Sequence, residues 1–243
     1  MAADRTVRVW EWVAAAHEGA GPVALAAVGR AAVRWLGVDG ASVTAVGSPA
    51  AREPLFASDE LSARLEELQF TLGEGPAVAE FRLGSPELVP DLELAGGRWP
   101  VFAPAAVAAG ARAMFAVPLQ AGAIRVGVLS LYRAAPGPLA AGELADVLVL
   151  AGIALQLVLD AAAGVSSVAG YPGPDGLPGS RAELYQAIGM VSVQLGVSLE
   201  EASARLRARA FASGAELRNL AEDVVSRRVR FDPDPEPDPE PLA

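Results

Sequence analysis

The chain has 243 residues, of which 52% are hydrophobic, and its formal net charge at pH 7 is −10. A chain of this length and composition can form one large domain or two smaller ones, each with an apolar core. The sequence contains no cysteine, which excludes a disulfide framework, a thiolate metal site and a cysteine nucleophile.

Charge is distributed unevenly along the chain. Residues 1–165 contain eleven arginines and seventeen carboxylates, a net charge of −6, and residues 232–243 add −5. Residues 181–231 contain eight arginines and six carboxylates, a net charge of +2. Nonspecific attraction to nucleic acid is therefore opposed everywhere except in residues 181–231. Charges also interrupt the first seventeen residues, so we expect no secretory signal and a cytoplasmic location.

Helical patterns open the chain. The spacing of apolar residues predicts one helix over 4–17 and a second from Pro22 to Leu36. A β-branched run over 42–46, bounded by glycines, predicts a strand, and 55–58 is expected to pair with it as a hairpin. Ser58 is then expected to cap a third helix.

Turns, short helices and strands alternate in the middle of the chain. A glycine-rich turn leads into a short helix with Pro76 in its first turn, where the missing N–H costs nothing. Residues 87–92 are predicted as an edge strand. Residues 112–119 and 124–133 form the strongest strand pair, joined by a four-residue turn, and we place them at the centre of a sheet.

A long helix is predicted over 139–163, and its apolar residues on nearly all sides predict burial on two faces. Its most apolar run contains Gln156 and is shorter than a bilayer requires, so we expect no membrane span. The order of elements predicts an α+β domain over residues 1–164, built on an antiparallel sheet flanked by helices. Residues 165–180 are rich in Gly, Pro and Ser and are predicted to be a flexible linker.

Three helices are predicted between residues 181 and 231. Gly196 and Gly214 mark the ends of the first two, because glycine tolerates a left-handed backbone. Ser198 followed by Glu201 predicts a capping box at the start of the second. Such short connections favour a compact all-α three-helix unit. The residues expected inside it are Leu184, Ile188, Val191, Leu195, Leu199, Ala202, Leu206, Ala210, Leu217, Leu220, Ala221, Val224 and Val225.

Several side chains fall outside these buried stripes. Projection at about 100° per residue places Met190, Val193 and Phe211 on outer faces. We expect another helix to cover Met190 and Val193, because exposed apolar patches usually mark contacts. Residues 232–243 alternate acidic residues with proline and are predicted to be an extended, disordered tail.

The three-helix unit resembles the ANTAR domain, the RNA-binding output module of bacterial transcription antiterminators. The resemblance rests on motifs in all three helices, in order: Ala187-Ile188-Gly189, then Ala202 with Leu206-Arg207-Ala208-Arg209-Ala210, then Leu217 with Leu220-Ala221. Ile188 stands where the family usually has lysine, which removes a possible phosphate contact.

Residues from about 5 to 162 resemble the GAF sensory domain found upstream of ANTAR modules in actinobacterial regulators. The motifs that carry this resemblance are Leu72-Gly73-Glu74-Gly75-Pro76, Val89-Pro90-Asp91, Arg98-Trp99-Pro100, Val117-Pro118-Leu119 and Gly127-Val128-Leu129-Ser130-Leu131-Tyr132. The family often has cysteine after the Gly-Glu-Gly-Pro step, whereas Ala77 occupies that position here and excludes thiol chemistry.

Together the two resemblances imply a signal-responsive antitermination regulator in which the sensory domain controls RNA binding. They also imply a homodimer that pairs RNA hairpins, with no DNA or membrane partner. Helices 4–17 and 139–163 are the expected dimer surface, with Met190 and Val193 as another. The candidate RNA-binding residues are Arg205, Arg207, Arg209, Phe211, Arg218 and Arg227.

No motif indicates catalysis or a metal site. His17 is the only histidine, and zinc requires several nitrogen or sulfur ligands. No pattern brings a base, a nucleophile and an oxyanion site together, so we expect neither an enzyme nor a bound cofactor. A small-molecule pocket is one interpretation of several aromatic and basic residues, and an ordinary core is the other. These residues are Phe81, Arg98, Trp99, Phe102, Arg112 and Phe115.

Two other functions stay open. The unit over 181–231 has little net charge for a nucleic-acid binder, so its exposed apolar residues could bind a protein partner instead. Alternatively, the protein is a ligand sensor whose helical end only dimerises. The acidic tail either aids solubility or competes with RNA for the arginines. Some of those arginines could form i,i+4 pairs that only support helices. These pairs are Glu201–Arg205, Arg218–Glu222 and Asp223–Arg227.

Overall fold

The computed structural model describes residues 2–18, 21, 23–48, 51–162 and 182–232. The chain divides into two compact units, Met1–Pro178 and Gly179–Ala243, which we call the sheet unit and the helical unit. The predicted linker over 165–180 lies outside the described residues, and so does the predicted acidic tail after Asp232.

The sheet unit is built on one antiparallel sheet of five strands in the order β2-β1-β5-β4-β3. The strands are β1 (Gly40–Ser48), β2 (Ala51–Ala57), β3 (Glu87–Val89), β4 (Ala113–Ala121) and β5 (Ile124–Arg133). The β4–β5 pair lies inside the sheet with β5 at its centre, as predicted. The predicted edge strand at 87–92 is shorter than expected, because the chain continues as the 3₁₀ helix η1 (Leu92–Ala95).

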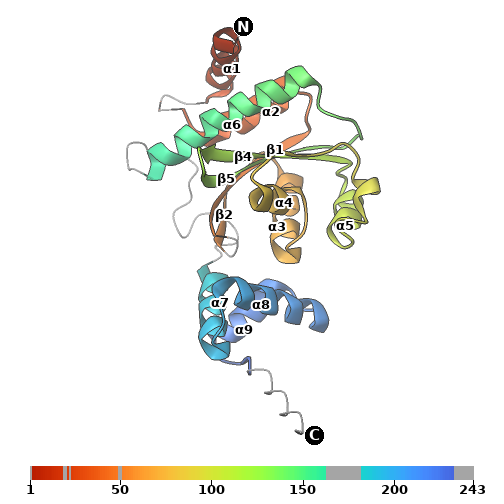
Figure 1. The fold of residues 1–243 in the computed structure, drawn as a ribbon, viewed down its shortest axis with the longest axis vertical. Helices are drawn as coiled ribbons and strands as arrows, with labels where there is room; N and C mark the ends of the chain where they lie inside the picture. The colour runs from red at the N-terminus through yellow and green to blue at the C-terminus, as the bar shows by residue number, and fades with distance from the viewer. Residues whose placement is uncertain (1, 19–20, 22, 49–50, 163–181, 233–243) are drawn as a thin grey trace, which may run out of the picture. The chain divides into compact units, whose positions relative to one another are not determined.

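Helices cover both faces of this sheet (Figure 1). Helices α2 (Leu25–Trp35) and α6 (Ala141–Ala162) lie on one face, and α1 (Ala2–Ala16) packs on the outer side of these two helices. Helices α3 (Glu60–Leu72) and α4 (Pro76–Leu83) lie on the other, and α5 (Phe102–Ala109) packs against α3. Side chains of β4 alternate between the two cores, with Phe115 on the side of α1, α2 and α6 and Met114 on the opposite side.

Helix α1 is attached to its neighbours by charge and by aromatic stacking as well as by apolar contacts. Arg5 and Arg8 both form ion pairs with the Asp146 carboxylate of α6, at 2.9 and 2.7 Å. Trp12 stacks on Trp35 of α2, with ring centroids 5.9 Å apart. Buried Val9, on the predicted apolar face of α1, completes the contact.

Three local predictions were wrong at helix starts and at a turn. Helix α2 begins at Leu25 rather than Pro22, because Ala24 has an extended backbone. Asp59, not Ser58, caps α3, and its carboxylate accepts a hydrogen bond from the Ser62 N–H at 2.8 Å. The turn between β4 and β5 has two residues rather than four, since pairing extends to Ala121 and Ile124.

Helix α6 is the one helix among the described residues that is long and apolar enough to cross a membrane by length and composition. It has 22 residues, which makes it longer than the apolar run considered from the sequence, and an 18-residue stretch of it has a mean hydropathy of 2.0. Its inner side chains, including Val147, Leu150 and Ala154, are fully buried in the core of the sheet unit.

The helical unit contains the three predicted helices, α7 (Ala182–Leu195), α8 (Leu199–Ser213) and α9 (Leu217–Val225). Gly196 and Gly214 have the predicted left-handed backbone, with φ of 67° and 65°. Ser198 caps α8 by accepting a hydrogen bond from the Glu201 N–H at 3.2 Å. Most of the predicted interior is buried, but Leu199 is 54% exposed. It is the first residue of α8, so no preceding turn lies beneath its side chain.

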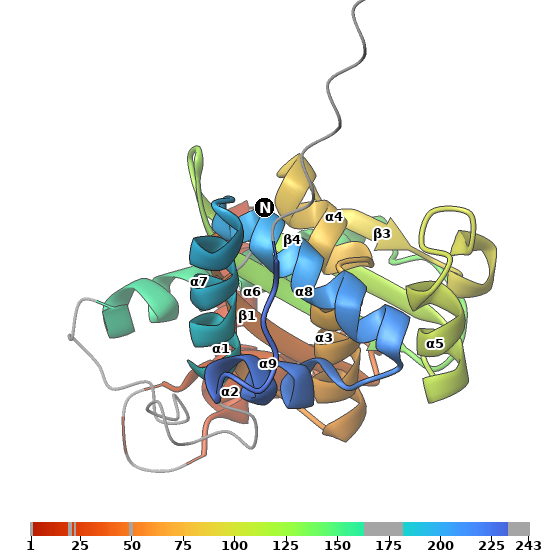
Figure 2. The ribbon, with the colours of Figure 1, turned by 90° about the horizontal axis from the view of Figure 1, so that it is seen from below.

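The chain folds back after α9 in a segment that we call the closing segment (Ser226–Phe231). Arg227 has a left-handed backbone with φ of 62°, and the next two N–H groups donate to the Asp223 carbonyl. Phe231 is 8% exposed, and its N–H donates to the Gln194 side-chain oxygen of α7 at 2.9 Å. In Figure 2 this dark blue segment runs from α9 between α7 and α8.

Candidate functional site

The four candidate RNA-binding residues of α8 lie on two different flanks of the helix. The buried stripe of α8 is formed by Ala202, Leu206 and Ala210, among others. Projected at about 100° per residue, Arg205 and Arg209 fall on one side of this stripe. Arg207 and Phe211 fall on the other side. The three arginines therefore do not form a single basic patch.

The flank with Arg205 and Arg209 is engaged within the unit. The Arg205 Nε lies 2.9 Å from the Glu201 carboxylate, one of the predicted i,i+4 pairs. The Arg209 Nη1 donates to the Arg230 carbonyl at 2.8 Å. Its guanidinium also lies 4.7 Å from the centre of the Phe231 ring, a cation–π contact. Arg209 thus binds the closing segment through both a hydrogen bond and a ring.

The other flank of α8 carries an exposed aromatic ring. Phe211 is 72% exposed, as its position predicted. One turn earlier, the Arg207 Nη1 donates to the Ser203 hydroxyl at 2.8 Å. The neighbouring outer residues are small and exposed, namely Ala204, Ala208 and Ala212. Apart from Arg207, the α8 neighbours of the Phe211 ring are therefore small.

The remaining basic candidates come from other elements. Arg218 is an exposed residue in the first turn of α9. Arg227 is exposed in the closing segment, and the predicted pair with Asp223 is replaced by an Asp223–Arg228 pair at 2.7 Å. Helix α9 ends at Val225, so Arg227 does not continue the helical spacing on which that prediction depended.

Ile188 departs from the family pattern for a reason that is visible in the packing. Its side chain is 3% exposed and lies on the inner face of α7 with Ala187 and Val191. A lysine at this position would have to reach past the core to meet solvent. In this chain the position belongs to the interior of the helical unit.

The six residues suggested as a ligand pocket are not brought together. Phe115 lies in the core under α1, α2 and α6, on the opposite face of the sheet from Trp99 and Phe102. Trp99 and Phe102 contact each other edge to face, with centroids 6.3 Å apart. Phe81 belongs to a third, smaller cluster with Ala77. The four aromatic residues therefore fall in three separate clusters.

The two arginines of that set are held by carboxylates. Arg98 stacks on Trp99, 4.4 Å from the ring centre, and pairs with Glu87 at 2.7 Å. Arg112 pairs with Asp91 at 3.3 Å and with Glu93 at 3.0 Å. Both stabilise the edge of the sheet around β3.

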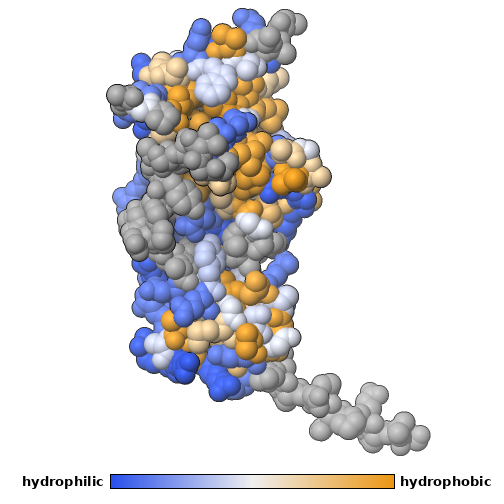
Figure 3. Space-filling model, turned by 90° about the vertical axis from the view of Figure 1, so that its left-hand side faces the viewer, coloured by the Kyte–Doolittle hydropathy of each residue, from blue (hydrophilic) through white to orange (hydrophobic). Residues whose placement is uncertain are grey.

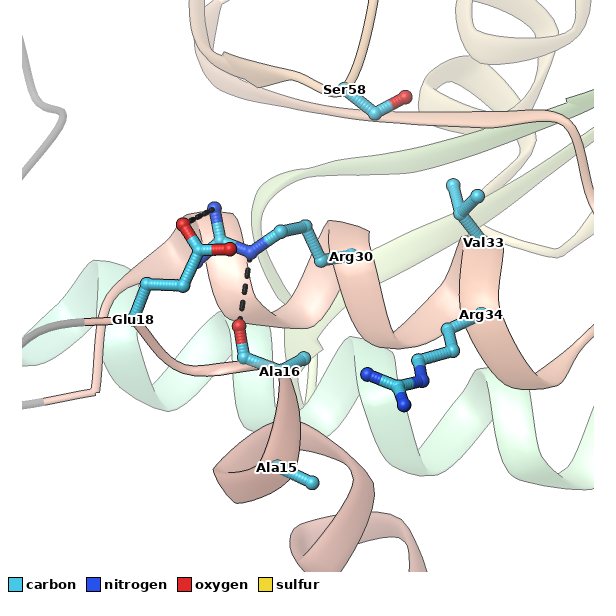
Figure 4. A pocket seen from close by; sticks show the side chains of 7 residues that line it. All are labelled: Ala15, Ala16, Glu18, Arg30, Val33, Arg34 and Ser58. Carbon is cyan, nitrogen blue, oxygen red and sulfur yellow. Dashed lines mark hydrogen bonds and ion pairs between the residues drawn. The ribbon is translucent and has the colours of Figure 1, made fainter.

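A pocket of about 310 Å³ lies elsewhere in the sheet unit, between α1 and α2. Figure 4 shows Arg30 directed toward Glu18 and the Ala16 carbonyl, and the Arg34 guanidinium nearby. Arg30 Nε donates to the Ala16 carbonyl at 2.9 Å, and its Nη1 lies 3.9 Å from Glu18. None of the six suggested pocket residues lines this space.

The Gly-Glu-Gly-Pro motif has a structural role. The Glu74 carboxylate accepts hydrogen bonds from the N–H groups of Val101 and Phe102, at 3.1 and 3.0 Å, and so caps α5. Gly75 has φ of 116°, and a Cβ there would lie 2.7 Å from the Gln69 side chain. The Gln69 oxygen in turn accepts a hydrogen bond from the Ala77 N–H.

A buried polar network lies between the sheet and α3. The Glu66 carboxylate accepts hydrogen bonds from the hydroxyls of Ser42 and Thr44, at 3.0 and 2.8 Å. Gln69 donates to the same carboxylate at 3.3 Å. All four side chains are buried, so the network is a fixed part of the core.

Glu80 is a buried carboxylate in the sheet unit, and its burial was not predicted from the sequence. Its side chain is fully buried on α4, and neither carboxylate oxygen has a hydrogen-bond partner in the described part of the chain. Burial raises the pKa of Glu80 to about 7, against the opposing attraction of Arg52 and Arg125. The only sequence signal is a single carboxylate among Ala77, Val78 and Phe81.

Within the described ranges, no group of three or more histidines and carboxylates could hold a metal ion. The ANTAR domain family model matches residues 179–225, which include α7, α8 and α9. A search of curated proteins finds no match.

Solved structures resemble the sheet unit. One is the GAF domain of a phosphoenolpyruvate-protein phosphotransferase from Coxiella burnetii, with 16% identity and a TM-score of 0.50 over 68% of this chain and 96% of that one. The GAF domain of the Acinetobacter phosphoenolpyruvate-protein phosphotransferase has 12% identity and a TM-score of 0.49, over 68% and 97%. The chain therefore combines a unit with the GAF fold and an ANTAR domain.

Proposed function

We propose that the protein is a cytoplasmic, signal-responsive regulator whose helical unit binds structured RNA and promotes antitermination of transcription. The observation that carries this proposal is the ANTAR match over 179–225, on a unit whose exposed surface includes Phe211 and several arginines. Folded RNA exposes unpaired bases in its loops, and these can stack on aromatic side chains while arginines contact phosphates. The sheet unit, with its GAF fold, supplies the sensory input.

The sensory unit has polar residues in places where a signal could act. Glu80 is buried without a hydrogen-bond partner among the described residues, and the pocket between α1 and α2 is lined by two arginines. A small ligand or a change in proton occupancy would alter the packing of α4 against the sheet, or of α1 against α2. In this proposal the altered packing changes the affinity of the helical unit for RNA.

The proposed assembly is a homodimer. Four large apolar side chains on α1 and α6 are exposed, namely Val7, Trp10, Leu148 and Leu159. Helices α1 and α6 pack against each other, so a second copy could cover these residues with a symmetric helical contact. On the helical unit, Val193 is 84% exposed and is a further contact candidate. Figure 3 shows such apolar patches between polar residues on the surface of both units.

The test is selection of RNA from a cell lysate with the purified full-length chain, followed by binding measurements on the selected hairpins. Phosphate contacts would make the logarithm of the affinity fall by about 0.7 per contact for each tenfold increase in salt on single strands. Sedimentation at micromolar protein tests the dimer. Failure to enrich any RNA, together with enrichment of a protein, would favour a protein-interaction module instead.

A further inference from the structure

All three arginines of α8 have partners within the helical unit, so the exposed Phe211 ring, more than the arginines, locates the RNA contact. Arg209 lies between the Arg230 carbonyl and the Phe231 ring, so moving it to a phosphate would open the closing segment. Arg205 is paired with Glu201 on the same flank. Both side chains therefore already make contacts within the helical unit.

The closing segment itself is a packed part of the unit. Phe231 is 8% exposed and is fixed to Gln194 of α7 through its N–H. Arg228 pairs with Asp223, and the Val229 N–H donates to the Asp223 carbonyl at 3.1 Å. The segment lies beyond residue 225, where the ANTAR match ends, so it is a feature of this chain outside the matched region.

The opposite flank has the shape of a stacking surface. The Phe211 ring is 72% exposed, and the adjacent outer positions of α8 are alanines, so a flat base can approach it. Arg207 lies one helical turn earlier, about 5.4 Å along the axis. A phosphate beside a base stacked on Phe211 is therefore within reach of the Arg207 guanidinium, which would exchange its hydrogen bond to the Ser203 hydroxyl for the phosphate.

We propose that the helical unit contacts RNA through the Arg207–Phe211 flank of α8, and that Arg205 and Arg209 are positioning residues for the folded unit and its closing segment. The inference rests on the proposed function, since it assigns the surface on which that function acts. Its ligand is an RNA hairpin with an unpaired loop, because a stacking surface requires an unstacked base. One aromatic ring among alanines offers a protein partner little apolar area, which favours RNA over protein at this flank.

The experiment uses the full-length chain and one selected RNA hairpin, compared with the same RNA closed into a full duplex. We expect Phe211→Ala to weaken binding to the hairpin about tenfold, since loss of one stacked base has roughly that effect. Phe211→Trp should restore it. Arg207→Gln should weaken binding and reduce the salt dependence by about one phosphate contact.

The matched control is Arg205→Gln on the other flank, which should change affinity by less than about twofold. Arg209→Gln should lower the melting temperature of the helical unit while leaving affinity within about twofold at temperatures where the unit is folded. Circular dichroism of each variant establishes folding. If the wild type binds the hairpin and Arg205→Gln weakens it as much as Phe211→Ala does, the assignment of flanks is overturned and RNA binding stands. If the wild type binds no RNA, the proposed function itself fails.

Discussion

The sheet unit and the helical unit differ in the charged groups that they bury. The sheet unit buries polar groups, with Glu66 in a hydrogen-bonded network and Glu80 without partners in the described part of the chain. The helical unit buries no charged side chain among its described residues, and its exposed apolar side chains include Phe211, at 72%, and Val193, at 84%. Buried polar groups make stability sensitive to protonation and mutation, whereas exposed apolar groups cost little stability and are available to partners. Stability is therefore the informative measurement for the first unit, and binding for the second.

The largest expected effect tests the buried network. Glu66→Ala should lower the free energy of unfolding of the sheet unit by about 3 kcal/mol, because the hydroxyls of Ser42 and Thr44 lose their acceptor in a buried position. Chemical denaturation monitored by circular dichroism measures the change. The neighbouring exposed residue gives a matched control, since Glu67→Ala should stay within about 0.5 kcal/mol. Equal effects of the two variants would contradict the special role of the network.

The next effect concerns the pH dependence of stability. Because the pKa of Glu80 is raised to about 7 in the folded state, folding favours its protonated form. Its contribution is fully present below the unfolded pKa and is lost as the pH rises through about 7. Between about pH 5 and about pH 8 this amounts to roughly 2 kcal/mol.

The variant Glu80→Gln isolates this contribution. Stability measured across that pH range should fall less steeply for Glu80→Gln than for the wild type, since the amide does not titrate. Glu60→Gln, at an exposed position in the first turn of α3, should keep the wild-type slope. Parallel curves for the wild type and Glu80→Gln would show that Glu80 is ionised in the folded protein.

A smaller effect is expected in the helical unit. Arg209→Gln should lower the stability of the helical unit by about 1 kcal/mol, because it removes the cation–π contact with Phe231 and the hydrogen bond to the Arg230 carbonyl. Hydrogen exchange of the Phe231 amide would report opening of the closing segment. Arg218→Gln, exposed on α9, is the control and should leave that exchange rate unchanged.

The smallest expected effect is on the stability of the helical unit when its exposed aromatic ring is removed. Phe211→Ala should change the stability of the helical unit by less than about 0.5 kcal/mol, since a largely exposed ring gains little from burial. Thermal unfolding measures the change. A loss of more than about 1 kcal/mol would show that the ring packs inside the unit and is not available to stack on a base.

The elements could be predicted from the sequence wherever periodicity was strong. The spacing of Leu184, Ile188 and Val191 defined α7, and the glycines at 196 and 214 marked helix ends. The N-cap of α3 was harder to predict, because the adjacent residues Ser58 and Asp59 can both cap a helix. Helical projection alone predicts that Arg205 and Arg209 lie on one flank of α8 and Arg207 on the other. The closeness of these arginines in the sequence suggested a single basic patch instead.

The site residues were less predictable, because they depend on which elements meet. Phe102 and Phe115 are close in the sequence, yet one begins α5 and the other points from β4 to the opposite core. Phe231 follows a charged run without periodicity, and its burial depends on contacts with α7 and α8. The burial of Glu80 could not be predicted from the sequence. Helix α4 has only eight residues, too few for the spacing of apolar residues to show which face is buried.

The closing segment determines where a C-terminal fragment of this protein can end. A fragment that stops at residue 225, where the family match stops, would lack Phe231 and leave Arg209 and Gln194 without their contacts. Such a fragment would expose the apolar surface that Phe231 covers, and the last turn of α9 would fray. Recombinant boundaries for the C-terminal piece therefore belong after Phe231.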